Sequence, residues 1–300
     1  MPPDGDRGMV RLLTKMAGEG MTGSLEGRVA LVTGGRRGIG AAIAHRLAAA
    51  GAAIIIAAEG RDDAGIAKTV DSITALGGRA QAIAFDLADP MARADAVARA
   101  AAPFGAIDIL VNNAAINNYA PASAMDPAYR HRLFEVNVHG PVDLIQQVLP
   151  AMKAQGWGRI VNISSATARP AGIPYSGDPA HVHGTAVYGA SKLALERFTR
   201  GLAAELHGTG ITVNAIHPTA VCVTDTNSMA ARAALATHPE WAETSDMMAE
   251  AALLLIGNML TGLVLPSRDV LFLLQAPLHA GDGRTVIGDA HHIPALIEGA

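Results

Sequence analysis

The chain has 300 residues, of which 50% are hydrophobic and 17% charged, with a formal net charge of −4 and one cysteine, Cys222. A small negative charge gives no general attraction to nucleic acid or to an anionic membrane, so we expect neither as a partner. A single cysteine excludes an internal disulfide framework and a metal site built on several thiolates. Such cysteine usage suits a reducing compartment, and we predict a cytoplasmic protein.

The two ends of the chain differ in character from its middle. Residues 1–24 are polar, contain several glycines and lack the apolar core of a secretory signal, so we expect a disordered extension. Met21 directly precedes the globular pattern and is a second candidate for the start of the protein. The apolar stretch from Ala251 to Leu265 is too short and too interrupted to span a bilayer. Residues 25–300 are predicted to form one domain.

The segment from Arg28 to Gly40 reads as a buried strand, a glycine-rich turn and the start of a helix. Glycines let the backbone approach a phosphate closely, and a helix N-terminus offers unpaired N–H groups and a partial positive charge. The turn lacks the Gly-Lys-Ser/Thr ending of a P-loop. We therefore predict a dinucleotide site whose contacts include Gly34, Arg36, Arg37, Gly38, Ile39 and Gly40.

Strand-like and helix-like segments alternate after Gly51, which indicates a parallel sheet covered on both faces. We predict an α/β fold, a Rossmann-type doubly wound sheet of about seven parallel strands with helices on both faces. The expected strands include 29–32, 52–57, 80–85, 107–111, 159–163 and 212–216. The expected helices are 41–50, 64–76, 90–101, 129–152 and 187–206.

The residues after the second strand should meet the adenosine ribose of the cofactor. Glu59 can hydrogen-bond a free ribose 2′-hydroxyl, which favours NAD, whereas Arg37 and Arg61 suit the 2′-phosphate of NADP. Ala58 stands where a discriminating carboxylate is expected. We predict NADP or NAD with a preference for NADP, and a solvated loop is the alternative reading of Arg61.

Two further strand ends are expected to border the cofactor. Asp86 and Leu87 follow the third strand and suit the adenine edge. After the fourth strand, small side chains would let the cofactor approach the backbone, and Asn112 is expected to support the neighbouring strand ends. The predicted contacts at that position are Asn113, Ala114 and Ala115.

Tyr188 and Lys192 lie four residues apart in a predicted helix, so their side chains should share one face. A free tyrosine has a pKa of about 10, and a neighbouring cation lowers that value. Tyr188 then becomes a candidate general acid or base. Such a pair is by itself more often a solvated face, but here it follows a strand that ends in Ser164 and Ser165, in a chain with a dinucleotide turn.

Taken together, these motifs resemble the short-chain dehydrogenase/reductase family. The matching residues run in the family's order from Leu25 to Thr219: Thr33-Gly34-x-x-x-Gly38-x-Gly40, Asp86-Leu87, Asn112-Asn113-Ala114, Asn137, Ser165, Tyr188-x-x-x-Lys192 and the Pro218 turn. The resemblance implies that Tyr188 exchanges a proton with the substrate oxygen, while Lys192 lowers the Tyr188 pKa and holds the nicotinamide ribose. It also implies that Ser165 hydrogen-bonds the substrate oxygen, and that Asn137 bends its helix and holds a water.

The chain also departs from the family pattern. Ser165 and Tyr188 are 23 positions apart (188 minus 165), more than is usual, and the insertion at 169–184 is predicted to cover the catalytic cleft or to be a surface excursion. Ala115 and Thr219 stand where the family has glycine. The resemblance nevertheless implies cofactor contacts from Pro218 and Thr219. Residues 261–265 match the family's lead-in to the last strand, but the family's usual Asp-Gly-Gly near the C-terminus is missing. Residues 276–300 have no family template that applies.

The sequence predicts an NAD(P)-dependent oxidoreductase that interconverts a secondary alcohol and a ketone by hydride transfer. The alternative is a catalytically weak dinucleotide-binding sensor or scaffold, and a nucleotide-sugar epimerase is disfavoured by the glycine spacing. Small and apolar residues in the expected substrate loop at 219–249 suggest an apolar substrate. No metal site is predicted, since Asp178, His181 and His183 lack a firm fourth ligand. The resemblance implies a homodimer or homotetramer through the helices that begin at Tyr129 and Val187.

Overall fold

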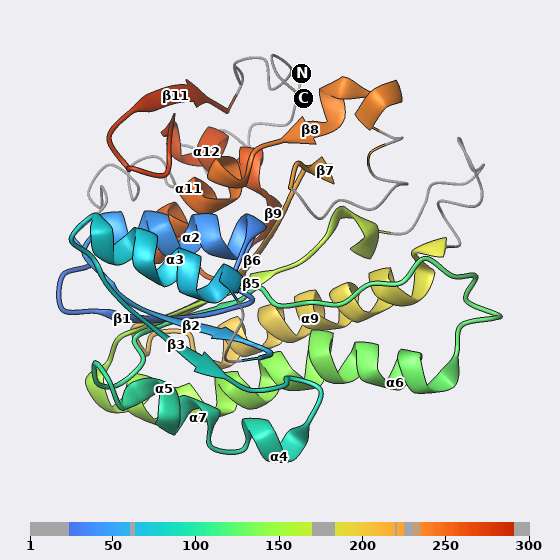
Figure 1. Ribbon diagram of the computed structural model, residues 1–300, viewed down its shortest axis with the longest axis horizontal. Coiled ribbons are helices and arrows are strands. Elements are labelled where there is room, and N and C mark those ends of the chain that lie inside the picture. The colour runs from blue at the N-terminus through green and yellow to red at the C-terminus, as the bar shows by residue number, and fades with distance from the viewer. Residues whose placement is uncertain are drawn as a thin grey trace.

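The computed structural model of the chain describes residues 24–60, 64–169, 184–219, 221–224, 232 and 235–290 (Figure 1). Three predictions fall wholly or mainly outside these residues. They are the disordered extension at 1–24, the role of Arg61, and the loop formed by the insertion at 169–184.

The predicted seven-stranded parallel sheet is confirmed. Its strands lie in the order β3-β2-β1-β4-β5-β6-β9, and every neighbouring pair is parallel. The strands are β1 (Val29–Thr33), β2 (Ala53–Ala58), β3 (Arg79–Ala84), β4 (Ile109–Asn112), β5 (Gly158–Ile163), β6 (Ile211–His217) and β9 (Val264–Pro266). The strand order reverses between β1 and β4, so a crevice is expected at the carboxyl ends of these two strands.

Helices cover both faces of the sheet, as predicted (Figure 1). One face carries α2 (Gly38–Ala49), α3 (Ala64–Ala75) and α11 (Ser245–Ile256). The other carries α5 (Ala96–Ala101), α7 (Gly140–Gln155) and α9 (Ala186–Glu205). Because both faces are covered, the central strands β1 and β2 are apolar along almost their whole length instead of alternating with polar residues.

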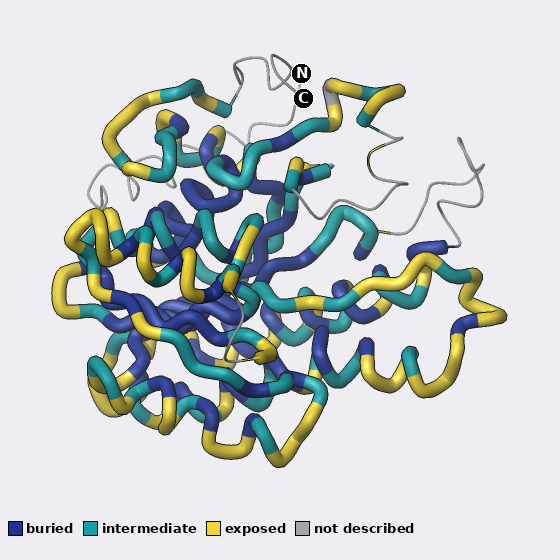
Figure 2. The backbone as a smooth tube through the Cα atoms, in the orientation of Figure 1, coloured by how far each residue is buried: buried dark blue, intermediate teal, exposed yellow. Residues whose placement is uncertain are grey.

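The alternation of side chains along each strand divides the core in two. In β1, Ala30 and Val32 pack under α2, while Val29 and Leu31 point to the face of α5, α7 and α9. The three isoleucines of β2, residues 54–56, divide in the same way and are fully buried. Figure 2 shows the central strands as the most continuously buried part of the chain.

Two predicted helices are interrupted. The helix expected at 90–101 consists of α4 (Pro90–Arg93) and α5, with a break between them. The helix expected at 129–152 begins earlier, as α6 (Pro127–Phe134), and passes through one π-helical turn, η1 (Glu135–His139), before α7. Pro141 has no N–H to donate to the carbonyl of Asn137, so a regular α-helical ladder cannot continue through this point.

The apolar stretch near the C-terminus enters the core. From Met247 to Ile256 every residue of α11 is buried, and this helix packs mainly against α2 and α12 (Ser267–Leu274). The stretch from Ala251 to Leu265 thus supplies the second half of this 12-residue core helix and leads into β9. Among the described helices, none combines the length and the apolar character that crossing a membrane requires.

The region without a family template folds back onto the first helix. After α12 it forms a hairpin of β10 (Pro277–His279) and β11 (Val286–Asp289). A buried ion pair joins Arg46 of α2 to Glu250 of α11, with N–O distances of 2.8 and 3.1 Å, and His279 Nδ1 lies 3.4 Å from the same carboxylate. A charge this deeply buried is tolerated only when it is paired, so these contacts fix how α11 and the start of the hairpin sit on α2.

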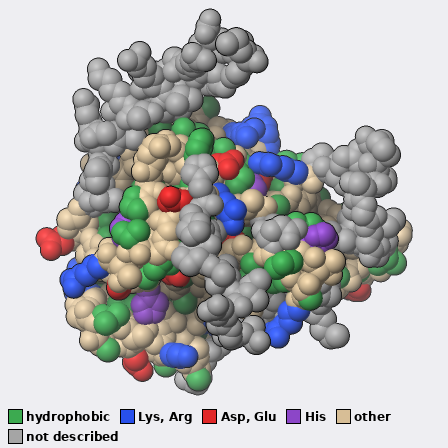
Figure 3. Space-filling view, turned by 90° about the horizontal axis from the view of Figure 1, so that it is seen from above, with side chains coloured by type: hydrophobic (Ala, Val, Ile, Leu, Met, Phe, Trp, Pro, Cys, Tyr) green, Lys and Arg blue, Asp and Glu red, His purple; other side chains and the backbone are tan. Residues whose placement is uncertain are grey.

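Short elements complete the description. The segment after β6 contains the two-stranded parallel pair β7 (Val221–Cys222) and β8 (Ala242–Glu243), and short 3-10 turns are found at η2 (Ala166–Ala168) and η3 (Pro239–Trp241). On the face shown in Figure 3, acidic and basic side chains are scattered singly among neutral ones.

Candidate active site

A cleft of about 600 Å³ opens where the carboxyl ends of β1, β2, β3 and β4 meet. An open parallel sheet binds its ligands at this kind of position, beside the reversal of strand order. Most of the predicted cofactor contacts line it, namely Gly34, Arg36, Arg37, Gly38, Ile39, Glu59, Asp86, Leu87, Asn113, Ala114, Ala115 and Tyr188. The fold therefore brings the glycine turn and the predicted catalytic tyrosine to one cavity.

The glycine turn between β1 and α2 forms one wall of the cleft. Gly34 and Gly38 have φ angles of +66° and +56°, a region that favours glycine. Gly40 lies beneath the turn, where a Cβ atom would fall 2.4 Å from the amide nitrogen of Asn113. A side chain would clash at Gly34 and Gly40 and would strain the backbone at Gly38. The N-terminus of α2 borders the cleft at Gly38 and Ile39. This cradle fits the diphosphate of a dinucleotide.

Hydrogen bonds join the strand ends beneath the cleft. Thr33 Oγ1 accepts from the backbone N–H groups of Asn113 and Ala114 at 3.0 and 3.1 Å. The side-chain amide of Asn113 donates to the Thr33 carbonyl at 2.9 Å. On the next pair of strands, the Asn112 amide donates to Asn162 Oδ1 at 2.9 Å, so the supporting role predicted for Asn112 is confirmed.

The predicted catalytic tyrosine, lysine and serine lie in one corner of the molecule. Tyr188 and Lys192 are one turn apart on α9, and Lys192 Nζ is 5.7 Å from the centre of the Tyr188 ring. Ser165 caps the 3-10 turn η2, and its hydroxyl hydrogen-bonds the Tyr188 side chain. Lys192 is buried and donates to the carbonyl of Ile163 at the end of β5, at 2.8 Å. Of this group, Tyr188 faces the cleft.

Asn137 lies in the π-helical turn and is fully buried. Its amide nitrogen donates to the Ile116 carbonyl at 2.9 Å and to Ser191 Oγ at 3.1 Å, and its Oδ1 accepts from the Ile116 N–H at 2.9 Å. Ser191 in turn donates to the Tyr188 carbonyl at 2.7 Å. The Asn137 side chain thus connects the segment after β4 to the helix that carries Tyr188. Both of its N–H donors are used by the protein.

The pKa of Tyr188 is shifted in the direction opposite to the prediction. Burial raises this pKa to about 12, although the hydrogen bond with Ser165 opposes the shift. Burial also lowers the pKa of Lys192 to about 8, against the attraction of the Glu196 carboxylate. The spacing of the pair in sequence shows that the two groups approach each other, but it does not show how much water both of them lose.

Arg132 lines the cleft, although the sequence does not single it out. It projects from α6 and donates to Asp86 Oδ2 at 3.2 Å and to Glu59 Oε1 at 3.3 Å. The sequence indicates such a residue only indirectly: Glu59 and Asp86 follow neighbouring strands, and two adjacent carboxylates are stabilised by a cation between them. The carboxylate of Glu59 is thereby engaged within the protein.

The segment after β6 meets the cleft at a residue other than the predicted ones. The resemblance implies cofactor contacts from Pro218 and Thr219, but neither residue lines the cleft. The Thr219 N–H instead donates to Glu243 Oε2 at 2.8 Å, and the hydroxyl of Ser267 donates to the other carboxylate oxygen. Glu243 is fully buried on β8, so it fastens this segment to the start of α12. Thr224, which was not predicted, does line the cleft.

Within the part of the chain that is described, no group of three or more His, Cys, Asp or Glu side chains is placed to hold a metal ion. The side chains weighed for such a site in the sequence, Asp178, His181 and His183, lie outside the described residues.

Comparisons with known proteins agree with this geometry. A family model described as short chain dehydrogenase matches residues 28–234. The short-chain reductase protein NovJ of Streptomyces niveus is 41% identical over 204 residues, covering 68% of this chain and 73% of NovJ. Galactitol 2-dehydrogenase of Agrobacterium fabrum is 39% identical over 197 residues, covering 65% of this chain and 70% of that enzyme.

A solved structure points the same way. The short chain dehydrogenase from Burkholderia cenocepacia, crystallised in complex with NADP, has 37% identity and a TM-score of 0.69, over 81% of this chain and 97% of that one. The family match covers more than half of the sequence, and the sheet order and cleft agree with it. The chain belongs to the short-chain dehydrogenase/reductase family, whose members are NAD(P)-dependent oxidoreductases.

Proposed function

We propose that the protein interconverts a secondary alcohol and a ketone, with NADP as the preferred hydride carrier and Tyr188 as general acid or base. The observation that carries this proposal is that Tyr188 lines the same cleft as the glycine turn, with the Ser165 hydroxyl and the Lys192 ammonium group beside it. The bound nicotinamide ring supplies or accepts the hydride. That the substrate is apolar stays a prediction.

The chain's own residues would hold the cofactor along the cleft. The turn at Gly34 and Gly38 and the N-terminus of α2 would bind the diphosphate. Asp86 and Leu87 would border the adenine, and Ala114 and Ala115 would lie against the central part of the cofactor. Lys192 would reach the nicotinamide ribose from behind Tyr188.

The proton chemistry follows from the two shifted pKa values. With a pKa of about 12, the phenol of Tyr188 is protonated at neutral pH and is ready to donate to a carbonyl oxygen, as reduction requires. Ser165 Oγ would hydrogen-bond the same substrate oxygen and orient it. In the oxidation direction Tyr188 accepts a proton from the alcohol, and the nearby Lys192 ammonium stabilises the phenolate.

We assign Asn137 a positioning role. Its side-chain amide holds the Ile116 backbone and Ser191, and so keeps α9 in register with the wall of the cleft. Both side-chain N–H groups are occupied by protein acceptors. A water contact at Asn137 remains a prediction from the family resemblance.

The charges near the ends of β2 and β3 support NADP over NAD. Arg36 and Arg37 line the cleft at the glycine turn. Arg132 ion-pairs with Glu59, the residue that would otherwise favour a free ribose hydroxyl. Among the described residues that line the cleft, Arg37 adds a guanidinium group beside this ion pair, and such a group suits a 2′-phosphate. The NADP in the related Burkholderia structure agrees with this preference.

The cofactor preference predicts the effect of replacing Arg37. Because an arginine–phosphate hydrogen bond is worth about 1.5–3 kcal/mol, Arg37→Ala should weaken NADPH binding roughly tenfold to a hundredfold. NADH lacks the 2′-phosphate, so its affinity should change by less than about threefold. Calorimetric titration with both cofactors measures the two effects. Equal losses for NADPH and NADH would contradict the assignment.

The catalytic assignment predicts that Tyr188→Phe loses turnover and keeps its cofactor. The substitution removes the hydroxyl that moves the proton and keeps the ring, so NADPH affinity should stay within about tenfold of the parent. The assay follows NADPH absorbance with a panel of ketones and secondary alcohols, and the binding control is titration of the same variant.

Full activity in Tyr188→Phe would overturn the role of the phenol. A parent protein that binds NADPH and turns over none of the panel would instead favour the dinucleotide-binding sensor or scaffold.

The Lys192 pKa predicts a pH dependence. A lysine with a pKa of about 8 is charged below that pH and loses its charge as the pH rises through it, so support for the Tyr188 phenolate is lost on the alkaline side. We expect kcat/KM for NADPH to be level near neutrality and to fall roughly tenfold per pH unit above about pH 8. Lys192→Arg keeps its charge there, so its profile should lack this alkaline limb. A parent profile that stays level to about pH 10 would be inconsistent with the assignment.

We also propose that a second copy of the chain packs on α7 and α9. These helices share a shallow apolar groove, and Leu193 on α9 is 50% exposed. The groove residues are Ile145, Gln146, Leu149, Ala194, Arg197, Phe198, Gly201, Leu202 and Glu205. Light scattering at micromolar concentration should give the mass of a dimer or tetramer, and a monomeric mass would reject the proposal.

A further inference from the structure

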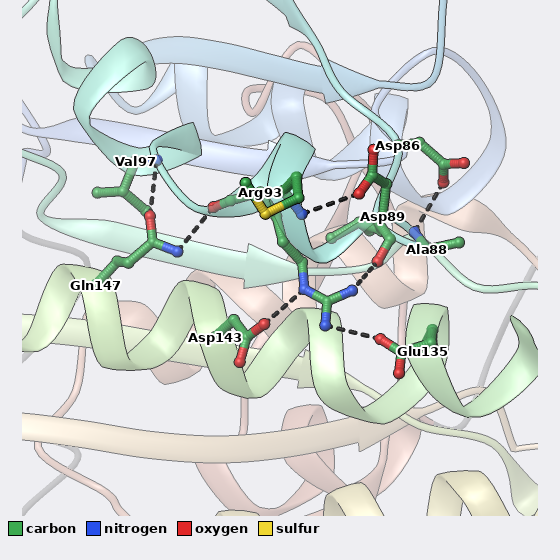
Figure 4. A network of polar contacts seen from close by, with 10 residues as sticks. Asp86, Ala88, Asp89, Arg93, Val97, Glu135, Asp143 and Gln147 are labelled. Atoms are coloured by element: carbon green, nitrogen blue, oxygen red, sulfur yellow. Dashed lines mark hydrogen bonds and ion pairs between the residues drawn. The ribbon is translucent and has the colours of Figure 1, made fainter. Parts of the chain in front are cut away.

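Arg93 is an almost completely buried arginine at the end of α4, 3% exposed, and it holds three separate groups (Figure 4). Its Nη1 donates to the Leu87 carbonyl at 2.6 Å. Its Nε donates to Asp143 Oδ2 at 2.5 Å, and its Nη2 donates to Glu135 Oε2 at 2.7 Å. One guanidinium group thus joins the loop after β3 to both η1 and α7.

The groups that Arg93 holds belong to two walls of the cofactor cleft. Leu87 lines the cleft from the loop after β3. Val136 lines it from the π-helical turn that begins at Glu135. Arg93 does not line the cleft itself and lies behind both walls. Because it bonds to the loop of Leu87 and to the turn of Val136, its contacts set the distance between these two walls.

The packing around this contact leaves little freedom. A Cβ atom on Gly140 would come within 2.9 Å of Leu87 Cδ2, so the loop after β3 is pressed directly against the start of α7. Asp86 is held at the same loop, because its Oδ1 accepts from the Ala88 N–H at 2.7 Å.

Arg93 is the last residue of α4 and directly precedes the break between α4 and α5. Gln147 of α7 stabilises the break, since its Nε2 donates to the Arg93 carbonyl at 2.9 Å and its Oε1 accepts from the Val97 N–H at 3.3 Å (Figure 4). The backbone on both sides of the break is therefore anchored to the helix that carries Asp143. Side chain and main chain of Arg93 are both fixed against α7.

We propose that Arg93 is a positioning residue of the cofactor site, which sets the separation of the two walls around the adenine and thereby the affinity for the adenosine half of the cofactor. This inference rests on the proposed function, because it assumes that an adenine dinucleotide occupies the cleft. Arg93 makes no contact with the ligand. Its planar fork suits the task, because a lysine cannot reach the three acceptors at once.

A merely structural role would predict lost stability with no selective loss of nucleotide binding. Arg159 offers a matched control, because it is another buried arginine, 5% exposed, that donates to backbone carbonyls. Its acceptors, Ile256, Gly158 and Gly210, lie away from the cleft, and Arg159 does not line it. Arg93→Met and Arg159→Met can therefore be compared at similar losses of thermal stability.

The test is calorimetric titration of each variant with NADPH and with 2′,5′-ADP, which carries only the adenosine half. We expect Arg93→Met to raise both Kd values about tenfold, because the walls lose their fixed spacing. Its kcat at saturating NADPH should stay within about threefold, since the groups that Arg93 holds do not include Tyr188, Ser165 or Lys192. Arg159→Met should leave both Kd values within about twofold of the parent.

Arg93→Lys keeps the experiment decisive if Arg93→Met does not fold, and it should give a smaller rise in the same two Kd values. Unchanged binding of 2′,5′-ADP in a folded Arg93 variant would overturn the inference and leave the proposed function intact. An equal rise in Arg159→Met would overturn it as well. A parent protein that binds neither 2′,5′-ADP nor 5′-AMP would overturn the proposed function, and the inference would fall with it.

Discussion

The junction between β1 and β4 is the constraint on which the rest of the site depends. The chain connections of these two neighbouring strands run in opposite directions along the sheet, which leaves a crevice above their carboxyl ends. The strand ends must be joined without filling that crevice. Asn113 joins them by donating to the carbonyls of Thr33 and Gly34, while Thr33 receives two backbone N–H groups in return. Because these contacts use backbone groups, one hydroxyl and one side-chain amide, the space above them stays open to a nucleotide. The glycine at position 40 is required by the same contact.

Regular, short-range patterns made most of the fold predictable. Buried parallel strands are almost continuously apolar, so a segment such as the isoleucine run at 54–56 is recognisable as a strand from its sequence. The spacing of Tyr188 and Lys192 placed both on one helix face, and the glycine turn was recognisable from its neighbours. Long-range effects escaped the sequence. The break after Arg93 depends on Gln147 more than 50 residues away, and Arg132 gains its partners only when α6 reaches the ends of two strands.

The electrostatics of the catalytic corner could not be read from spacing either. A cation near a phenol lowers its pKa when both face water, but here both groups are buried and desolvation prevails. Tyr188 is therefore protonated at neutral pH, and the pKa of the neighbouring Lys192, about 8, lies only slightly above that pH. Such a site is poised for donating a proton to an arriving carbonyl. The segments at 170–183 and 225–231, where substrate contacts were expected, lie outside the described residues.

The buried carboxylate of Glu243 has a consequence for replacing the segment after β6 by that of another family member. It accepts from the Thr219 N–H and from the Ser267 hydroxyl, so it joins the beginning and the end of the stretch between these two residues. If this stretch were replaced by one from a relative, the Ser267 hydroxyl would lose its acceptor unless the new stretch carried a carboxylate at the position of Glu243. Chimeric proteins are expected to fold when the exchanged segment runs from the end of β6 into α12. They are expected to fail when the junction between the two parent sequences falls inside that segment.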